Sequence, residues 1–357
     1  MKNHRIGGEY YYTPALLFKK KKISFDEYVR TNFPDKFYSF TGGGYFSIAL
    51  ILKNLAFRSK DEVLLPSYIC PTVLIPFKKQ KINYRFYKIN EHLKVDIRDL
   101  QKKITPDVKA VFFINYFGFP QDEDVKTFLK ELKQQGLIII EDLVQSFFSR
   151  SELIGNYAFN SLRKFMPVDG SIIISDQELT NDHMVNFTKY FFYRLGGRYF
   201  KYLVIKLGST RDNFFLDLFK KAEKYYYTTD TFGFNTYNSY IFSKFDIGQL
   251  CSKRISHFNI LLCEFEKYSL FNPLPDNVTP LSFPIIIENR DKVRSQLAKK
   301  NIFCPVHWKL SDEINKKEFE ESWYLSEKIL SIPVNENIHD ADLKYLVQNL
   351  VDNLSTY

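Results

Sequence analysis

The sequence predicts an α/β fold with a large domain, built on a mainly parallel sheet flanked by helices, and a small C-terminal α+β domain. Between residues 61 and 176, short apolar runs alternate with longer amphipathic runs. This alternation indicates βαβ units whose strands are buried on both faces and therefore lack a polar side. The chain has 357 residues, 45% of them hydrophobic, which is enough for a large and a smaller domain, each with its own core.

Each run in this region has an expected place in the fold. Strands are expected at 62–68, 82–89, 110–118 and 137–142, and helices at 70–80, 97–104 and 124–136. The clearest helix signal is "DEDVKTFLKELKQQG", which has acids at its start, lysines near its end and Gly136 as a stop. Ligands in parallel α/β folds bind where strands end at their carboxyl edge, so a site is expected there.

The pattern changes after residue 176. Residues 180–245 are irregular, aromatic and basic, and we interpret them as an insertion plus a helix. The next stretches are a long amphipathic helix at 246–268, an apolar run at 281–288 and helical runs at 290–302 and 343–354. We therefore expect a large domain over 1–245, which includes the N-terminal segment and the insertion, and a small domain over 246–357.

The charge of the chain bears on its partners. The formal net charge is +9, and its densest cluster is the run "FKKKK" at 18–22. Short lysine runs are usually solvated, although a basic surface also suits a polyanion or a phosphorylated small substrate. No recognisable nucleic-acid recognition module accompanies the lysines, so we expect no nucleic-acid partner.

Cysteine spacing and hydropathy bear on the compartment. Cys70, Cys251, Cys263 and Cys304 include no CxxC pair and no histidine at metal spacing, so neither a disulfide framework nor a metal site is expected. Free cysteines fit a reducing cytoplasm. No stretch approaches the ~20 uninterrupted apolar residues of a membrane helix, and the first residues lack the apolar core of a signal peptide, so we expect no membrane insertion.

Three stretches carry residue types that indicate chemistry. In "LIIIEDLVQS", Asp142 directly follows a buried-type strand, so its carboxylate is expected at the carboxyl edge of the sheet. In "FTGGGYFSIALILKN", Gly42, Gly43 and Gly44 precede an apolar helical pattern, where backbone N–H groups and the helix dipole can hold a phosphate. In "FNSLRKFMPVDG", Lys164 has apolar surroundings, in which a lysine tends to lose its proton and can form a Schiff base.

A phosphate cradle, a carboxylate and an imine-forming lysine are together what pyridoxal phosphate requires. The cofactor acts as an electron sink, the carboxylate keeps its ring nitrogen protonated, and the lysine holds its aldehyde until a substrate amine replaces it. Taken separately, Asp142 could cap a helix, Lys164 could lie on the surface and the glycines could form a loop. Their combination in this chain order favours a pyridoxal phosphate site.

The sequence resembles the sugar aminotransferases of the DegT/StrS type, within fold type I of the pyridoxal phosphate enzymes. The resemblance runs from about residue 39 to 350 and includes "TGGGYFSIAL", "DEVLLPSYICPTV", "ITPDVKAVFFINYFGFPQDED", "IIIEDLVQS" and "FNSLRKFMPVDG". Later stretches agree in the same order, namely "GFNTYNSYIFSKFDIGQL", "IFCPVHWKL" and "EKILSIPVN". The resemblance implies the aspartate-aminotransferase fold, with a seven-stranded, mainly parallel sheet, and the cofactor pyridoxal 5'-phosphate.

The resemblance also implies how the cofactor is bound. Lys164 corresponds to the catalytic lysine that bonds to the cofactor, Asp142 to the partner of the pyridine nitrogen, and Gln145 to a residue near the ring hydroxyl. The other residues expected around the cofactor are Gly42, Gly43, Gly44, Tyr68, Cys70, Ser161 and Asn235.

Further residues are implied at the subunit interface and at the substrate. The asparagine that Asn235 matches reaches across a two-fold interface to the cofactor phosphate of the partner subunit, so a homodimer with shared active sites is expected. His307 and Tyr237 are expected to contact the substrate. The implied substrates are a nucleotide-linked sugar and an amino-acid donor.

The chain departs from the family pattern at several positions. Gly43 stands where the family usually has threonine or serine, so a hydroxyl contact to the phosphate is missing. Ser161 lies three residues before Lys164, whereas the sugar aminotransferases usually place their phosphate serine five before, where this chain has Phe159. The turn after the lysine is reduced to "VDG", and Tyr237 replaces an arginine.

Two functions compete on these residues. The first is an aminotransferase that moves an amino group from an amino acid such as glutamate to a nucleotide-linked keto sugar, in polysaccharide or glycan biosynthesis. The second is a catalytically altered or inactive fold-type-I homologue that binds a ligand or acts as a regulatory protein, which the departures motivate. Retention of Lys164 and Asp142 favours the first. A dehydratase of the same family is disfavoured, since that variant carries histidine in place of the lysine.

Overall fold

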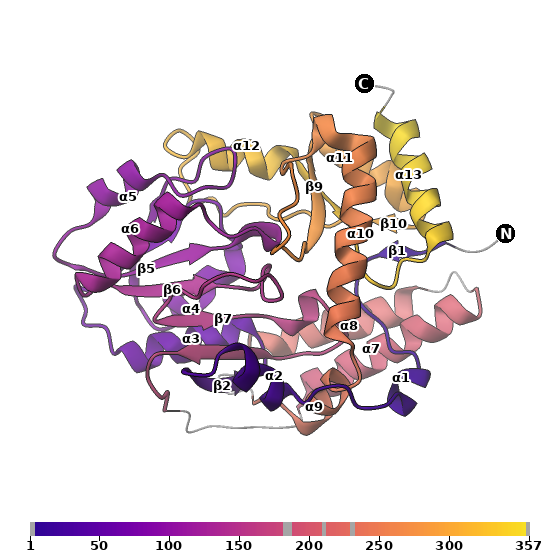
Figure 1. Cartoon of the computed structure of the whole chain (residues 1–357), viewed down its shortest axis with the longest axis horizontal. Helices are drawn as coiled ribbons and strands as arrows, with labels where there is room; N and C mark the ends of the chain where they lie inside the picture. Colours follow the sequence, from indigo (N-terminus) through magenta and orange to yellow (C-terminus); the bar gives the residue numbers. More distant parts are fainter. Residues whose placement is uncertain (1–3, 181–187, 209–211, 229–232, 355–357) are drawn as a thin grey trace.

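A seven-stranded sheet flanked by helices lies at the centre of the computed structural model, which describes residues 4–180, 188–208, 212–228 and 233–354 (Figure 1). Its strands are β2 (Phe37–Thr41), β3 (Glu62–Pro66), β4 (Asn83–Tyr87), β5 (Val108–Ile114), β6 (Ile138–Asp142), β7 (Tyr157–Phe159) and β8 (Ser171–Ser175). The spatial order is β2-β8-β7-β6-β5-β3-β4, and β8 alone runs in the direction opposite to the other six strands. The predicted mainly parallel, seven-stranded sheet is confirmed.

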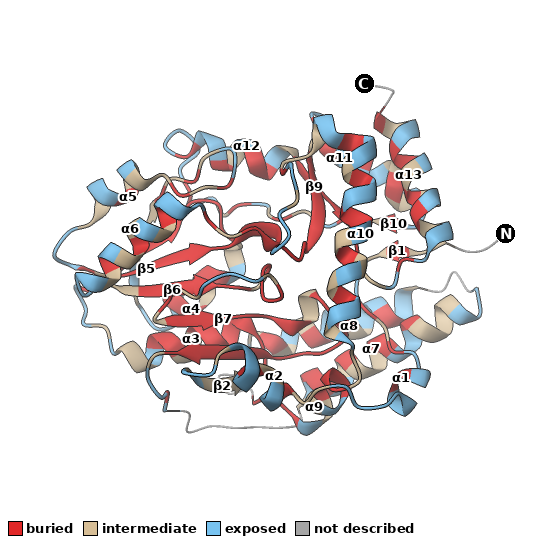
Figure 2. Cartoon of the chain, viewed as in Figure 1, coloured by how far each residue is buried: buried red, intermediate tan, exposed pale blue. Residues whose placement is uncertain are grey.

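The strands form where the apolar runs predicted them, because these runs can be buried on both faces of a sheet. The runs at 62–68, 82–89 and 137–142 contain β3, β4 and β6, whereas the run at 110–118 overlaps β5, which begins at Val108 and ends at Ile114. Figure 2 shows β5, β6 and β7 coloured as buried along most of their length. Since β5, β6 and β7 are parallel, their carboxyl ends meet at one edge of the sheet.

The helices of the first part of the chain are α1 (Ala15–Phe18), α2 (Phe25–Asn32), α3 (Gly44–Leu55), α4 (Leu74–Lys79), α5 (Ile97–Lys103) and α6 (Glu123–Gln134). Of these, α3 to α6 form where helical runs were predicted, whereas α1 and α2 were not predicted. Helix α6 lies within the stretch with the clearest signal and buries Val125, Leu129 and Leu132 on one face. Helix α3, predicted to follow the glycine run, begins at the third glycine, Gly44.

The segment 180–245 is more regular than predicted. Its described residues form α7 (Lys189–Lys206), α8 (Asn213–Tyr226) and α9 (Thr236–Phe242), and α7 and α8 pack against each other (Figure 1). The buried face of α7 includes Arg194, Arg198 and Lys201, which interrupt the apolar periodicity that identifies a helix.

These buried arginines have partners that explain their burial. Asp169, in the "VDG" turn, forms ion pairs with Arg194 at 3.2 Å and with Arg198 at 2.7 Å. Glu9 pairs with Arg194 at 2.9 Å. Buried charges are tolerated when they are paired and hydrogen-bonded, so this cluster joins α7 to the turn and to the N-terminal segment.

The C-terminal part contains helices and two small two-stranded sheets. Its elements are α10 (Ile247–Phe265), β9 (Ser282–Ile286), α11 (Arg290–Lys299), β10 (Ile302–Phe303), α12 (Glu320–Lys328), β11 (Ile329–Pro333) and α13 (Asp340–Leu354). Strand β9 pairs with β11 antiparallel, and β10 pairs in parallel with β1 (Ile6–Gly7). The predicted domain boundary after residue 245 falls between α9 and α10 and remains a prediction.

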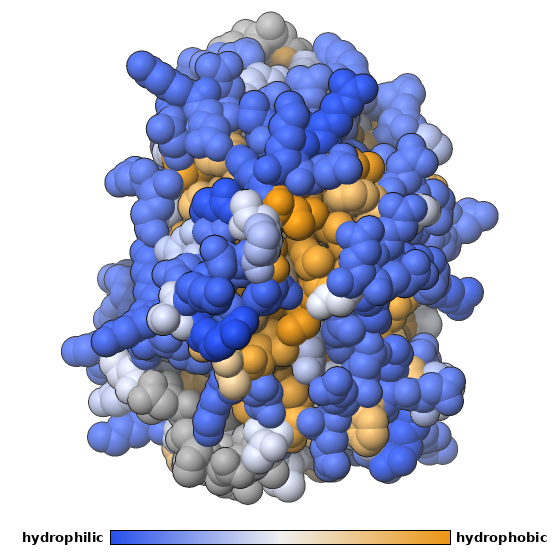
Figure 3. Space-filling view, turned by 90° about the vertical axis from the view of Figure 1, so that its left-hand side faces the viewer, coloured by the Kyte–Doolittle hydropathy of each residue, from blue (hydrophilic) through white to orange (hydrophobic). Residues whose placement is uncertain are grey.

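The surface at the left of Figure 1 is mainly hydrophilic, with a band of hydrophobic residues that runs down its middle (Figure 3). Helices α5 and α6 lie on this side of the molecule (Figure 1). Over the described residues, every helix is too short or too polar to cross a membrane.

Candidate active site

Asp142 stands at the carboxyl end of β6, in the middle of the sheet, and is 5% exposed. One of its oxygens, Oδ1, accepts a hydrogen bond from the backbone N–H of Val144 at 2.7 Å. Burial raises the pKa of Asp142 to about 7, against the lowering effects of the Val144 amide and the charge of Lys164. Within the described residues the Asp142 carboxylate forms no ion pair. A positively charged ligand could therefore form an ion pair with it.

Gln145 lies on the loop that follows β6 and is 1% exposed. Its Oε1 accepts a hydrogen bond from the backbone N–H of Phe117 at 2.6 Å, which fixes the orientation of the amide. Its Nε2 is buried and has no hydrogen-bond partner in the described part of the chain. A buried donor without a partner is costly unless a ligand accepts its hydrogen bond.

Lys164 ends the short helical turn η3 (Leu162–Lys164), between β7 and β8. The loop is closed by a backbone hydrogen bond from Leu162 to Gly170 at 3.0 Å. Lys164 lines a cavity of about 550 Å³, together with His307 and with residues of the N-terminal segment. Burial and the neighbouring Arg163 charge lower the pKa of Lys164, although Cys70, Glu9 and Glu223 oppose them. The amine is therefore easier to deprotonate than an ordinary lysine.

His307 lies on the same cavity wall, 7% exposed. Its Nδ1 is 2.8 Å from the Ser331 hydroxyl. Burial and the charge of Lys164 lower the pKa of His307 to about 3, so the imidazole is neutral at neutral pH. The structure thus brings His307 and Lys164 to one cavity, as expected for a residue near the substrate.

The glycine loop brings a helix amino terminus to the same region. Gly43 is the N-cap residue of α3, and no side chain forms a capping hydrogen bond at this end of the helix. Beneath the loop, Thr41 and Ser47 hydroxyls are 2.8 Å apart, and Ser47 donates to Ser171 at 2.7 Å. In the first turn of α3, the N–H groups of Phe46 and Ser47 donate to the Gly43 carbonyl oxygen at 2.9 and 3.1 Å, so the N–H groups of Gly44 and Tyr45 are the ones that can donate to an anion.

Asn160 and Ser161, which precede Lys164 in the chain, are both buried near the glycine loop. Asn160 is 1% exposed, its Oδ1 accepts from the Ile172 N–H at 2.8 Å, and its Nδ2 has no partner in the described chain. The Asn160 carbonyl oxygen would lie 3.3 Å from a Cβ placed on Gly44. Ser161 is also buried, at 6% exposure.

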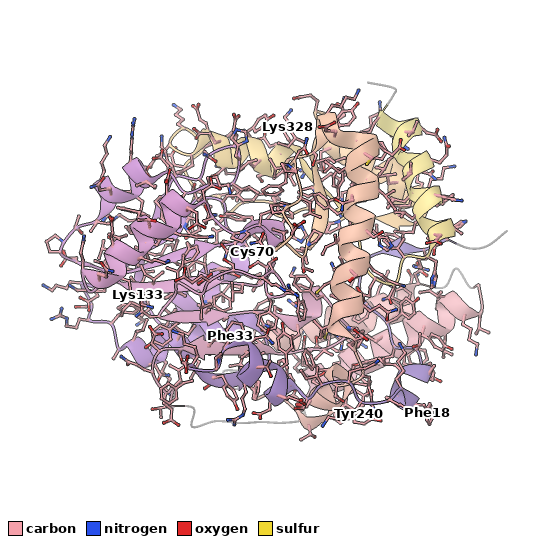
Figure 4. The ribbon with its side chains drawn as sticks, viewed as in Figure 1. Phe18, Phe33, Cys70, Lys133, Tyr240 and Lys328 are labelled. Carbon is pink, nitrogen blue, oxygen red and sulfur yellow. The ribbon has the colours of Figure 1, made fainter. Side chains whose placement is uncertain are left out.

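Tyr68 and Cys70 are two further residues that were predicted to lie beside the cofactor. Tyr68 is fully buried, and its hydroxyl donates to the His307 carbonyl oxygen. Cys70 lies near the middle of the view in Figure 4 and is partly exposed, with its Sγ 3.1 Å from the Thr72 hydroxyl. The roles of Tyr68 and Cys70 beside the cofactor ring remain predictions.

Asn235 and Tyr237 lie at the start of α9. The Asn235 side chain accepts a hydrogen bond from the Asn238 N–H at 2.9 Å and so caps α9. Tyr237 packs with edge contacts against Tyr12 and Phe191, at ring distances of 6.1 and 5.5 Å. Within the chain, both residues have structural contacts, and their predicted roles across an interface and at the substrate remain predictions.

Sequence reasoning missed several residues near Lys164. Arg163 forms an ion pair with Glu223 of α8 at 2.7 Å, and both line the cavity, as does Glu9 of the N-terminal segment. Arg294 of α11 lines it too. A signal for α8 existed, because Phe215, Phe219, Ala222 and Tyr226 follow helical spacing, whereas the position of Glu9 depends on a pairing remote in sequence.

The fold and this site define a fold-type-I scaffold of the aminotransferase class. Residues 23–203 match the DegT/DnrJ/EryC1/StrS aminotransferase family, and the chain belongs to this family. The family resemblance inferred from the sequence is therefore confirmed.

Curated relatives match over part of their length. The chain is 28% identical over 135 residues to GDP-4-keto-6-deoxy-D-mannose 3-dehydratase of Yersinia pseudotuberculosis, covering 35% of this chain and 34% of the relative. It is 22% identical over 154 residues to GDP-perosamine synthase of Escherichia coli O157:H7, covering 40% and 42%. The chain thus spans less than half the length of these relatives.

Solved structures match over nearly the whole chain. The aminotransferase PseC of Helicobacter pylori, involved in the biosynthesis of pseudoaminic acid, has a TM-score of 0.72 at 12% identity and covers 99% of this chain and 100% of its own. The PLP-form of the sugar aminotransferase Spr1654 of Streptococcus pneumoniae, described as putative, has a TM-score of 0.68 at 13% identity and covers 98% and 93%. These likenesses confirm the fold.

Pyridoxal phosphate is the cofactor of this family, and the residues present fit it. Asp142 would hold the ring nitrogen, because a buried carboxylate without a cation gains from a protonated partner. Gln145 Nε2 would donate to the ring hydroxyl, which satisfies a buried orphan donor. The amino terminus of α3 would hold the phosphate, and Lys164 would bond to the aldehyde.

Proposed function

We propose that this protein is a pyridoxal phosphate-dependent aminotransferase that transfers an amino group from an amino acid, such as glutamate, to a nucleotide-linked keto sugar. The observation that carries the proposal is the pairing of two opposed pKa shifts at one sheet edge. The pKa of Lys164 is lowered and the pKa of Asp142 is raised to about 7. Opposed shifts in one site are typical of acid and base roles.

Lys164, Asp142 and His307 have different roles in the proposed reaction. When bound, the cofactor supplies an aldehyde for amines and an electron sink for the substrate carbon. Lys164 Nζ, once deprotonated, would hold the cofactor by its aldehyde and would be the base that holds or returns the proton of the substrate carbon. Asp142 would keep the ring nitrogen protonated. Neutral His307 lines the cavity as a hydrogen-bonding group without adding charge.

The cavity suits charged substrates. Arg163, Lys164 and Arg294 line it together with Glu9 and Glu223. Positive groups among these can attract the carboxylate of an amino acid and the phosphates of a nucleotide sugar, which are both anions. The net charge of +9 also favours the approach of anionic substrates. We place the protein in the cytoplasm, where nucleotide sugars and reduced thiols coexist.

We also propose a homodimer with shared sites. Asn235 Oδ1 caps α9 of its own chain, so Nδ2 is the group that would reach the partner's cofactor phosphate. Complementation between subunits, described in the Discussion, tests this arrangement.

A 3-dehydratase is the second candidate, because relatives from Yersinia pseudotuberculosis and Escherichia coli O55:H7 carry that name. The presence of Lys164 favours amination, since the dehydratase variant of the family has histidine at this place.

The deciding experiment mixes purified protein with pyridoxal phosphate, glutamate and a GDP-linked 4-keto-6-deoxy sugar, and analyses the products by mass spectrometry. Amination predicts an amino sugar and 2-oxoglutarate in equal amounts. A deoxygenated sugar without amino transfer supports the dehydratase. A protein that binds the cofactor but converts neither glutamate nor any keto sugar supports the altered, non-catalytic homologue.

A further inference from the structure

The phosphate end of the site lacks the hydroxyl that the family pattern supplies, because Gly43 stands in its place. Helix α3 begins at Gly44 without a side-chain cap. The N–H groups of Gly44 and Tyr45 can donate to a phosphate, yet backbone amides alone give a dianionic phosphate no cation and no hydroxyl. The structure shows where both could come from.

Tyr226, the last residue of α8, lies against the glycine loop. It is 2% exposed, and its ring packs beside Phe46 at 5.0 Å and Tyr190 at 5.1 Å. A Cβ on Gly43 would overlap the Tyr226 hydroxyl oxygen. The hydroxyl of Tyr226 therefore fills the space that a threonine or serine side chain would occupy at position 43.

Arg163 also contacts Tyr226. The carbon of its guanidinium lies 5.0 Å from the centroid of the Tyr226 ring. Glu223, one turn before Tyr226 on α8, pairs with Arg163 at 2.7 Å and holds it there. One helix thus delivers a hydroxyl and orients a cation beside Lys164.

A buried donor nearby indicates that a ligand completes this region. Asn160 Nδ2 is buried and without a partner among the described residues, and the Asn160 carbonyl oxygen contacts the Gly44 position. A phosphate oxygen would satisfy such a donor.

We propose that Tyr226 and Arg163 bind the cofactor phosphate in place of the missing threonine or serine hydroxyl. This inference rests on the proposed function, since it takes the ligand to be pyridoxal phosphate. In this chain, Gly43 and Tyr226 form a matched pair: the glycine makes room for the tyrosine hydroxyl, and the hydroxyl replaces the side chain that the glycine lacks. Helix α8 of the inserted segment is then a part of the cofactor site.

The test compares two ligands that differ only in the phosphate. Dissociation constants of pyridoxal phosphate and of pyridoxal are measured by absorbance for the wild type, Tyr226→Phe and the control Tyr225→Phe, which alters the neighbouring residue of the same helix. Tyr226→Phe keeps the ring and removes one hydroxyl. Loss of a hydrogen bond to a charged group predicts roughly 10- to 100-fold weaker binding of pyridoxal phosphate. Pyridoxal binding should not change, and Tyr225→Phe should match the wild type for both ligands.

A second pair of variants tests the matched positions. Gly43→Thr alone should weaken pyridoxal phosphate binding, because the new side chain overlaps the Tyr226 hydroxyl. Adding Tyr226→Ala should recover only part of the lost binding, because it removes the overlap while the positive φ of Gly43, 158°, still strains a threonine at this position. Circular dichroism of every variant establishes that the fold is retained.

The outcomes separate this inference from the function. A wild type that binds pyridoxal phosphate more tightly than pyridoxal, with Tyr226→Phe unchanged, overturns the inference and leaves the function standing. Equal weakening of both ligands by Tyr226→Phe also overturns it, since that pattern reports general packing. A wild type that binds neither ligand overturns the proposed function and this inference with it.

Discussion

Replacing Asp142 with asparagine should stabilise the cofactor-free protein while weakening the cofactor-bound one. Asparagine keeps the shape of the side chain, and its Oδ1 can still accept from Val144 N–H, as Asp142 does at 2.7 Å. What changes is the buried charge. Burial raises the pKa of Asp142 from 3.8 to about 7, so folding opposes ionisation of this carboxyl.

The sign and size of the effect follow from linkage between protonation and folding. The folded-state pKa lies above the unfolded one, so the carboxyl destabilises the fold increasingly as pH rises from about 4 to about 7. A tenfold difference in proton affinity between the folded and unfolded chains corresponds to ~1.4 kcal/mol, so the destabilisation is about 2 kcal/mol at pH 5 and about 4 kcal/mol at pH 8. The stability advantage of Asp142→Asn should therefore grow by roughly 2 to 3 kcal/mol between these pH values.

The assay is urea unfolding of cofactor-free wild type and variant at pH 5 and pH 8. A stability difference that does not grow with pH would show that Asp142 is not an isolated buried acid in the folded chain. With cofactor present, the variant should lose most turnover, because asparagine carries no charge to keep the ring nitrogen protonated. Wild-type turnover in Asp142→Asn would refute the role assigned to this carboxylate.

Three further outcomes concern Lys164 and the dimer, and a fourth concerns Arg163. Borohydride treatment of the cofactor-bound protein, followed by peptide mapping, should locate the pyridoxyl group on Lys164, and a label on another lysine would reject the assignment. Lys164→Ala should show no amino transfer from glutamate, while circular dichroism shows an unchanged fold. Mixing Lys164→Ala chains with Asn235→Ala chains should restore part of the activity if sites are shared, whereas a fully active monomer contradicts the dimer. In Arg163→Ala, loss of a nearby positive charge should raise the pKa of Lys164, so the rate of reaction with pyridoxal should reach its plateau at a higher pH than in the wild type.

The sheet and the residues at its edge could be predicted because they depend on local patterns. Buried strands are continuous apolar runs, and the residue after such a run lies at the carboxyl edge, which is where Asp142 is found. Lys164 could be singled out for the same reason, since it follows β7 in a short loop. The family resemblance then supplied the roles of the two residues.

The inserted helices could be predicted only in part, because their packing depends on paired charges. Arg194 and Arg198 occupy the buried face of α7, where a sequence pattern indicates a polar face, and they are buried because Asp169 pairs with both. The approach of Tyr226 to Gly43 is likewise invisible in the sequence, since it depends on how α8 packs against α3. A missing hydroxyl is apparent from the sequence, whereas its replacement is apparent only in three dimensions.

The parallel pairing of β1 with β10 bears on how the molecule is made. Ile6 lies opposite Ile302, and the following residues Gly7, Gly8 and Glu9 line the same cavity as Lys164. The wall formed by Gly7, Gly8 and Glu9 is therefore synthesised before the rest of the cavity. The neighbouring strand β1 can pair only after β10 has been synthesised. Nascent chains that end before residue 302 lack the strand that pairs with β1, so this wall of the cavity gains its backbone pairing only after residue 302 has been synthesised.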